Sequence, residues 1–172
     1  AVGFSHLDSG ALYRAITAVA LDEASSAGLD NPLALPPDSV LRAAEDRGLM
    51  LQPDGATFAA YLDGEPAEAR IRSASVTAHV SAVSAVPVVR EWVNARLREL
   101  ARAGVGVVVD GRAIGTVVFP DADLKVFLTA TPEARARRRL EQRGQAVDPA
   151  ELGRETERLA AQIPQRDVDA AD

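Results

Sequence analysis

Apolar residues recur along this chain with the spacing of helices in some segments and of strands in others. From Ala11 to Ala24 they return every three or four positions, which predicts an amphipathic helix with Asp8 or Ser9 as its N-cap. The same spacing, opened by a proline or a polar cap and ended by a glycine, predicts further helices. These lie at about residues 37–47, 75–83, 87–103, 134–143 and 151–162.

Short apolar runs predict the strands. Val105–Val109 is a continuous β-branched run of the kind buried on both faces of a parallel sheet, and Leu124–Leu128 is interpreted as a second such strand. Residues 2–7 form another extended stretch, while runs at 49–51 and 57–62 predict a small antiparallel meander. Strands that alternate with helices indicate an α/β domain with a parallel sheet, and the meander indicates an α+β insert.

The composition limits the classes of protein to which this chain can belong. With 172 residues, 47% of them hydrophobic, the chain is long enough to bury the core of one domain. The net charge of −6 argues against a nucleic-acid binder, and no apolar run approaches the roughly 20 residues of a membrane helix. Cysteine is absent, as suits a reducing cytosol, so we expect a cytoplasmic protein. Lys125 is the single lysine, so the positive charge is almost all guanidinium, which binds phosphate bidentately.

Two predicted strands end in polar groups and a glycine. Asp8-Ser9-Gly10 and Asp110-Gly111-Arg112 each follow an extended run, and Arg14 lies one helical turn beyond the first of them. Ligands of open α/β sheets bind beyond the carboxyl ends of the strands. An aspartate there more often caps a helix or a turn, but phosphoryl-transfer enzymes also use this position to hold a carboxylate near magnesium. Two such ends, each beside an arginine, indicate a phosphate site.

Three segments carry a resemblance to a known family. Leu7–Arg14 resembles the LDSGAxYR segment of bacterial cytidylate kinases, and Asp110–Ala122 resembles their DGRDIGTVVFPDA segment except at Ala113. Leu124–Arg139 is similar to the strand and arginine-rich helix that follow in that family. The order and separation of the segments agree as well, so the resemblance covers nearly the whole chain.

The resemblance implies a fold and an activity. The fold would be the parallel-sheet P-loop nucleoside monophosphate kinase fold, with a core and lid formed by 1–37 and 87–172 and an inserted α+β CMP-binding domain over 38–86. The activity would be transfer of the ATP γ-phosphate to CMP or dCMP, with Mg²⁺ as cofactor. The family also implies a monomer without nucleic-acid or membrane partners.

The resemblance further implies roles for individual residues at the acceptor site. Arg14 and Arg112 would clamp the phosphate of CMP, with Asp8 and Ser9 beside them. Asp110 would lie near the magnesium ion and the transferred phosphoryl group, acting through water rather than as a direct metal ligand.

Two more groups of residues follow from the same resemblance. Ser81 and Arg90 would read the cytosine base. Arg137 and Arg139 would begin the lid and meet the ATP phosphates, although at least one residue of the run 137–139 must face solvent because neighbouring helix positions point in different directions. Arg166 would contact the substrate, but the register of the segment from Arg166 to Asp172 fits the family in two ways.

The sequence departs from the family pattern in two further respects. The phosphate-loop motif G-x-x-x-x-G-K-[ST] does not occur in it, so we expect these residues by themselves to be inactive toward ATP. Ala113 stands where the family has an aspartate that accepts a hydrogen bond from cytosine. Losing such an acceptor costs about 1–3 kcal/mol, which predicts weaker CMP binding and weaker rejection of UMP.

Two alternatives therefore stay open. One is a nucleoside monophosphate kinase that tolerates UMP, and the other is a non-catalytic nucleotide-binding module. Translating the codons upstream of Ala1 distinguishes a kinase from a module, because only a kinase needs a phosphate loop there. His6 and His79 have no partner at metal-ligand spacing, and Trp92 is predicted to be a partly buried packing residue.

Overall fold

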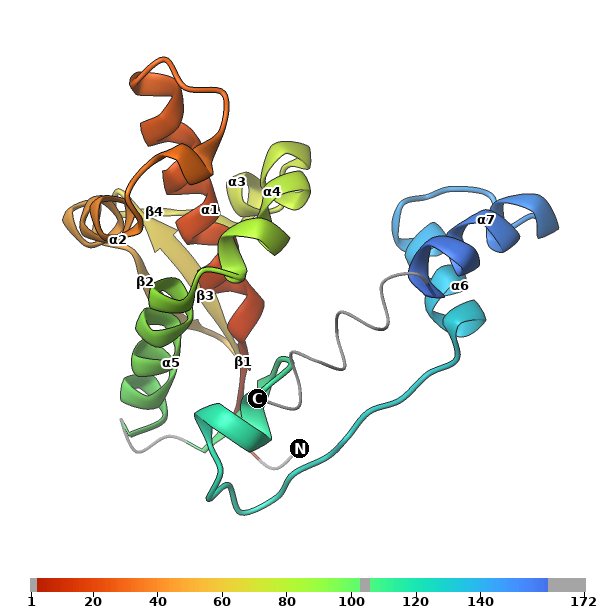
Figure 1. Ribbon diagram of the computed structural model, residues 1–172. Coiled ribbons are helices and arrows are strands. Elements are labelled where there is room, and N and C mark those ends of the chain that lie inside the picture. Colours follow the sequence, from red (N-terminus) through yellow and green to blue (C-terminus); the bar gives the residue numbers. More distant parts are fainter. Residues whose placement is uncertain (1–2, 103–105, 161–172) are drawn as a thin grey trace. The chain divides into compact units, whose positions relative to one another are not determined.

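The computed structural model describes residues 3–102 and 106–160 of the chain (Figure 1). It divides into two compact units, Ala1–Gly111 and Arg112–Asp172. Each unit is described by itself. Within the described residues, no helix has both the length and the apolar character needed to cross a lipid bilayer.

A mixed sheet forms one layer of the first unit. Its strand order is β2-β3-β1-β5, with β4 paired to β3. Strands β1 and β5 run parallel, and so do β1 and β3, whereas β2 and β4 are antiparallel to β3. The predicted α/β class is therefore confirmed. The strands are β1 (Ser5–Asp8), β2 (Met50–Asp54), β3 (Thr57–Leu62), β4 (Glu65–Pro66) and β5 (Val107–Asp110).

Helix α1 (Ser9–Ser26) is the helix around which the first unit packs (Figure 1). Leu12, Ile16 and Val19 are fully buried on it, and it contacts four other helices and β3. Burial on so many sides explains why apolar residues occupy most of its surface. The other helices are α2 (Pro37–Asp46), α3 (Glu68–Ile71), α4 (Ala74–Ser84) and α5 (Pro87–Arg102), with a 3₁₀ turn at Pro32–Ala34.

The helix ends and turns follow the predicted signals. Asp8 caps α1 by accepting a hydrogen bond from the Gly10 amide at 2.8 Å. Gly48, at a φ of 64°, ends the helical segment that begins at Pro37. Asp63 and Gly64 both have positive φ, 58° and 79°, and form the tight turn between β3 and β4.

The predicted meander at 49–62 is confirmed as the antiparallel pair β2 and β3, and β4 adds a short third strand beyond that range. It does not stand apart from the rest of the sheet, because His6 of β1 is in parallel register with Thr57 of β3. The division of the chain into a kinase core and an inserted CMP-binding domain at 38–86 stays a prediction.

The second unit contains a helical hairpin formed by α6 (Pro132–Gln142) and α7 (Pro149–Ala160). Thr131 caps α6 by accepting a hydrogen bond from the Ala134 amide, and Pro132 occupies its first turn. Ala136 and Leu140 of α6 are buried, as is Leu159 of α7. A single wide helical turn, Ile114–Val118, comes earlier in this unit.

The predicted strand at Leu124–Leu128 is wrong for this structure. The segment is extended but has no strand partner among the described residues, and the side chains of Leu124, Val126, Phe127 and Leu128 are 76–87% exposed. A strand exists only where a neighbour satisfies its backbone N–H and C=O groups. An apolar run indicates a tendency to be buried but cannot supply that neighbour.

Candidate functional site

The two strand ends predicted to carry chemistry are adjacent in the sheet. Parallel pairing of β1 and β5 places Leu7 opposite Val109 and Asp8 opposite Asp110. Both aspartates therefore lie at the carboxyl edge of the same sheet, where open α/β folds bind their ligands. The Asp110 side chain is 64% exposed and that of Asp8 is 34% exposed, so both remain accessible to a ligand.

The two carboxylate oxygens of Asp8 make different contacts. Its Oδ1 accepts the Gly10 amide and so fixes the start of α1, while its Oδ2 lies 3.7 Å from Nη2 of Arg72. A Cβ at Gly10 would come within 2.9 Å of the capping oxygen, so glycine lets the strand pass directly into the helix. Ser9, the first residue of α1, is buried at this junction.

A histidine side chain lies beside Asp110. Oδ1 of Asp110 lies 3.3 Å from Nε2 of His6, a side chain of the neighbouring strand β1. The sequence predicts only a structural role for His6, and its position beside a candidate site carboxylate is a feature that sequence reasoning missed.

Arg14 is held against helices α3 and α4. Its Nη1 donates to the hydroxyl of Thr77 at 3.1 Å and to the backbone carbonyl of Ile71 at 3.4 Å. Thr77 and Ser81 are four residues apart on α4 and so share a face of that helix. The packing of α1 on α4 therefore directs Arg14 toward the face on which Ser81 lies.

Arg90 lies where α4 passes into α5. Its Nε donates to the carbonyl of Ser84, at the end of α4, at 2.8 Å. Burial raises the pKa of Tyr13 on α1, and the charge of Arg90 partly opposes that shift. The first unit thus brings predicted residues from the start of α1, from α4 and from the first turn of α5 into one region.

Arg72 and Thr77 are the polar neighbours of the site that the sequence did not reveal. Arg72 also donates to Glu68 at 2.8 Å, an i,i+4 contact typical of a solvated helix surface. No local pattern separates these two residues from other surface arginines and threonines. Their importance arises only because the fold places them beside Asp8 and Arg14.

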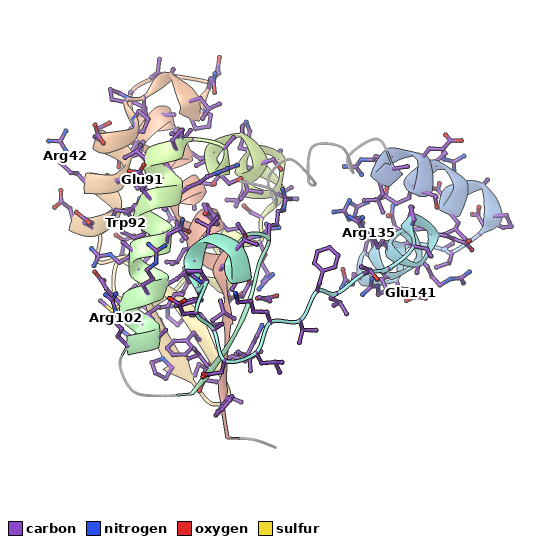
Figure 2. The ribbon with its side chains drawn as sticks, turned by 60° about the horizontal axis from the view of Figure 1, so that its bottom comes forward. Arg42, Glu91, Trp92, Arg102, Arg135 and Glu141 are labelled. Atoms are coloured by element: carbon purple, nitrogen blue, oxygen red, sulfur yellow. The ribbon has the colours of Figure 1, made fainter. Side chains whose placement is uncertain are left out.

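In the second unit, the arginines of α6 divide between two faces. Nη2 of Arg137 lies 3.9 Å from Glu133 on an exposed face, whereas Arg139 turns toward Glu155 of α7. At least one residue of 137–139 is expected to face solvent, and both Arg137 and Arg138 are exposed, whereas Arg139 is half-buried. The roles given to Arg137 and Arg139 stay predictions. A small cavity of about 210 Å³ opens on the other face, where Arg135 extends from α6 (Figure 2). Its lining residues are Arg135, Arg138, Arg139, Gln142 and Leu159.

For two predicted site residues the structure gives no position relative to these groups. Arg112 is the exposed first residue of the second unit, so its pairing with Arg14 stays a prediction. Arg166 lies outside the described residues.

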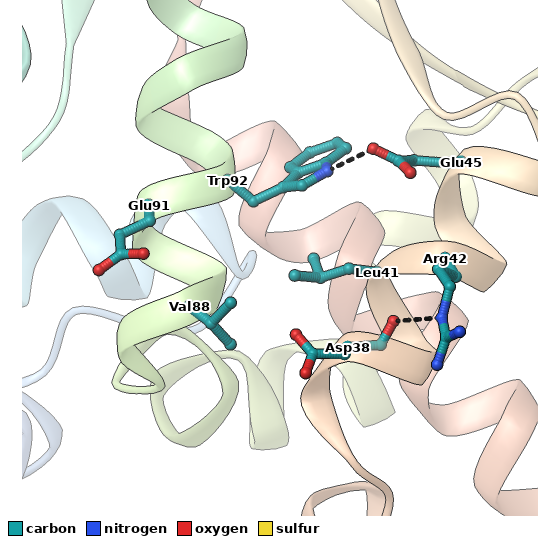
Figure 3. A pocket seen from close by; sticks show the side chains of 7 residues that line it. All are labelled: Asp38, Leu41, Arg42, Glu45, Val88, Glu91 and Trp92. Atoms are coloured by element: carbon teal, nitrogen blue, oxygen red, sulfur yellow. Dashed lines mark hydrogen bonds between the residues drawn. The ribbon is translucent and has the colours of Figure 1, made fainter.

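A hollow of about 610 Å³ lies between α2 and α5 in the first unit (Figure 3). None of the predicted site residues lines it. Trp92 is half-buried at its edge, as predicted, and its indole N–H donates to Glu45 at 2.8 Å. This hydrogen bond, followed by that from Arg96, lowers the pKa of Glu45. The contact joins α5 to α2 and so has an evident structural role.

The comparisons with known proteins agree with the motifs. The family model described as cytidylate kinase matches residues 1–172. The chain belongs to the cytidylate kinase family. A cytidylate kinase of Streptomyces griseus is 42% identical over 99% of this chain and 76% of its own length. Those of Pelotomaculum thermopropionicum and Mycobacterium avium are 45% and 41% identical, over 91% and 97% of this chain and 68% of their own lengths. The resemblance found from the sequence is confirmed.

Proposed function

We propose that this protein is a cytidylate kinase that transfers the γ-phosphate of ATP to CMP or dCMP. Membership of the family is the basis, and one structural observation supports the site in particular. Asp8 and Asp110 lie in register at the carboxyl edge of the sheet, next to the start of the helix that carries Arg14. Carboxylates and a guanidinium at one sheet edge are the groups that phosphoryl transfer requires.

The acceptor phosphate would be held by Arg14 and Arg112. Thr77 and the Ile71 carbonyl hold Arg14 through Nη1, so that its guanidinium is oriented before a ligand arrives. A fixed guanidinium loses little freedom on binding a phosphate and can offer two parallel hydrogen bonds. Ser81 and Arg90 would then meet the base from α4 and α5, which pack on each other.

Magnesium would act at the carboxylate edge. Among the described residues no group of three or more histidine, aspartate or glutamate side chains is arranged to hold a metal ion. Mg²⁺ keeps several of its waters and often uses only one or two carboxylates, and the exposed Asp110, with Asp8 opposite, fits that mode of binding through water. When bound, the ion would neutralise charge on the transferred phosphoryl group.

The donor phosphates would meet the cavity of α6. Arg135, Arg138 and Arg139 line it together, at i, i+3 and i+4 of one helical face. This proposal keeps Arg139 of the predicted pair, adds Arg135 and Arg138, and leaves out Arg137, which does not line the cavity. From the family resemblance we further propose a cytoplasmic monomer, and the net charge of −6 argues against a nucleic-acid partner.

The first experiment separates the kinase from a non-catalytic nucleotide-binding module. Codons upstream of Ala1 are translated, and the product of the whole reading frame is assayed for ADP release with CMP, dCMP and UMP. A phosphate loop upstream and turnover with CMP support the proposal. CMP binding by calorimetry without ADP release would instead establish the module. Equal turnover of CMP and UMP would support the UMP-tolerant kinase.

A further inference from the structure

A carboxylate is buried in the seam between α6 and α7. The Glu155 side chain is 8% exposed, and Glu155 and Leu159, one turn apart on α7, are both buried. Ala136 and Leu140 are buried on the facing helix. Glu155 thus occupies a position where the pattern of an amphipathic helix calls for an apolar residue.

Three guanidinium groups surround this carboxylate. Nη1 of Arg139 donates to its Oε1 at 3.4 Å. Oε2 of Glu155 lies 3.3 Å from Nη1 of Arg158 and 3.7 Å from Nη1 of Arg143. One negative charge therefore faces three positive charges, and the cluster keeps an excess that attracts anions.

Packing alone does not explain a carboxylate at this position. Replacing a buried ion pair by apolar side chains of similar size is often neutral or stabilising. An apolar residue at position 155 would extend the buried seam of Leu140 and Leu159. What distinguishes Glu155 from an apolar residue here is its contact with three arginines.

We infer that Glu155 is a positioning residue for the arginine face of α6. It holds Arg139 through Nη1, so the rest of the guanidinium is presented to the cavity that Arg135 and Arg138 also line. A guanidinium fixed in advance binds an anion more tightly than one that must be ordered on binding. The inference rests on the proposed function, in which these arginines bind the polyphosphate chain of the donor nucleotide.

Glu155→Leu in the full protein tests this role because two mechanisms predict opposite results. Removing a negative charge strengthens anion binding if long-range electrostatics alone matter. If Glu155 positions Arg139, binding weakens instead. Inorganic tripolyphosphate titrated by calorimetry is the probe. We expect about tenfold weaker binding, with helix content and melting temperature unchanged or higher. Affinity equal to or above that of the wild type would overturn the inference.

Two other substitutions at this seam complete the test. Glu155→Gln keeps the shape of the side chain and should weaken tripolyphosphate binding less than Glu155→Leu does. If Glu155→Leu does not fold, Glu155→Gln decides, together with the ¹H–¹⁵N signal of the Arg139 Nε. That signal should lose protection from exchange when the carboxylate is gone, and an unchanged signal with unchanged affinity would count against positioning.

Matched controls separate this inference from the proposed function. Glu133→Gln removes the same charge from the exposed face of α6 and should leave tripolyphosphate affinity unchanged or slightly raised. Arg139→Ala should weaken the binding of both tripolyphosphate and ATP. If Arg139→Ala has no effect, the proposed donor site is wrong. If Arg139→Ala weakens binding while Glu155→Leu does not, only the role of Glu155 is wrong.

Discussion

Asp8 and Asp110 lie opposite each other at the last residues of two parallel strands. Asp8 is committed to capping α1 through one oxygen, whereas Asp110 lies beside His6 and is 64% exposed. The two carboxylates are thus unequal: one supports the start of a helix, and the other is available to a hydrated cation.

This inequality predicts different outcomes for the two carboxylates. Asp110→Asn should lower kcat by roughly 10²–10³-fold, since it removes charge where the phosphoryl group is transferred, and should raise the Mg²⁺ concentration needed for half-maximal rate. Asp8→Ala should mainly lower the melting temperature, because it removes the side-chain oxygen that caps α1. Steady-state kinetics at varied Mg²⁺ make the measurement, with Asp38→Asn as an exposed control. A variant Asp110→Asn with wild-type Mg²⁺ dependence would remove Asp110 from the site.

The proposed phosphate clamp predicts coupling between Arg14 and Arg112. Replacing Arg112 by Ala should raise the KM for CMP and lower kcat together, because the clamp acts in both ground and transition states. Arg14→Ala should do the same. If both guanidinium groups hold one phosphate, the double variant should lose less than the sum of the two single losses in ln(kcat/KM). Arg42→Ala, which replaces an exposed arginine of α2 outside the predicted site, is the matched control. Strictly additive losses would show that Arg14 and Arg112 do not share a ligand.

Replacing Ala113 should increase the selectivity for CMP over UMP. Ala113→Asp restores the acceptor that the family places at this position, and one hydrogen bond to a buried partner is worth about 1–3 kcal/mol. The ratio of kcat/KM for CMP over UMP should therefore rise about 5–150-fold at that energy. Ala113→Asn, which also offers an acceptor but no charge, separates hydrogen bonding from electrostatics. An unchanged ratio in both variants would show that position 113 does not face the base.

A charged network on the first unit predicts acid sensitivity. Arg47 donates to Asp63 through two nitrogens, at 2.9 and 2.5 Å, and also reaches Asp22, which pairs with Arg70. The hydrogen bond from Arg47 lowers the pKa of Asp63 below the usual value of an aspartate. The folded state therefore gains stability from ionised Asp63 above that value and loses it as the pH falls through the lower, folded pKa.

The variant Asp63→Asn tests this network without disturbing the turn, since asparagine also tolerates the positive φ of 58° found at this position. It should cost about 0.5–1 kcal/mol at pH 7, the range of exposed ion pairs. The free energy of unfolding of the variant and of the wild type is measured in urea at pH 7 and at pH 3. The difference from the wild type should shrink at the lower pH, and a difference that does not change with pH would mean that the charge of Asp63 contributes nothing.

Much of the fold could be predicted from local signals. Asp8 and Thr131 cap their helices, Pro37 opens another, and Asp63-Gly64 forms a turn. Each of these features depends on hydrogen bonds or backbone preferences within a few residues of sequence. Leu124–Leu128 could not be predicted in this way. Its apolar character is local, whereas strand formation depends on a neighbour elsewhere in the chain.

By itself, the sequence determined the family, the α/β class and the identity of the candidate groups, since motifs and periodicity are written in consecutive residues. Only the tertiary structure decided which groups meet. Arg14 donates a hydrogen bond to Thr77, which is 63 residues away in the sequence, and Arg139 donates one to Glu155, which is 16 residues away. Helix packing brings these pairs together, and no local pattern encodes it. A guanidinium binds where its partners direct it, and those partners are brought together by burial of apolar faces rather than by proximity along the chain.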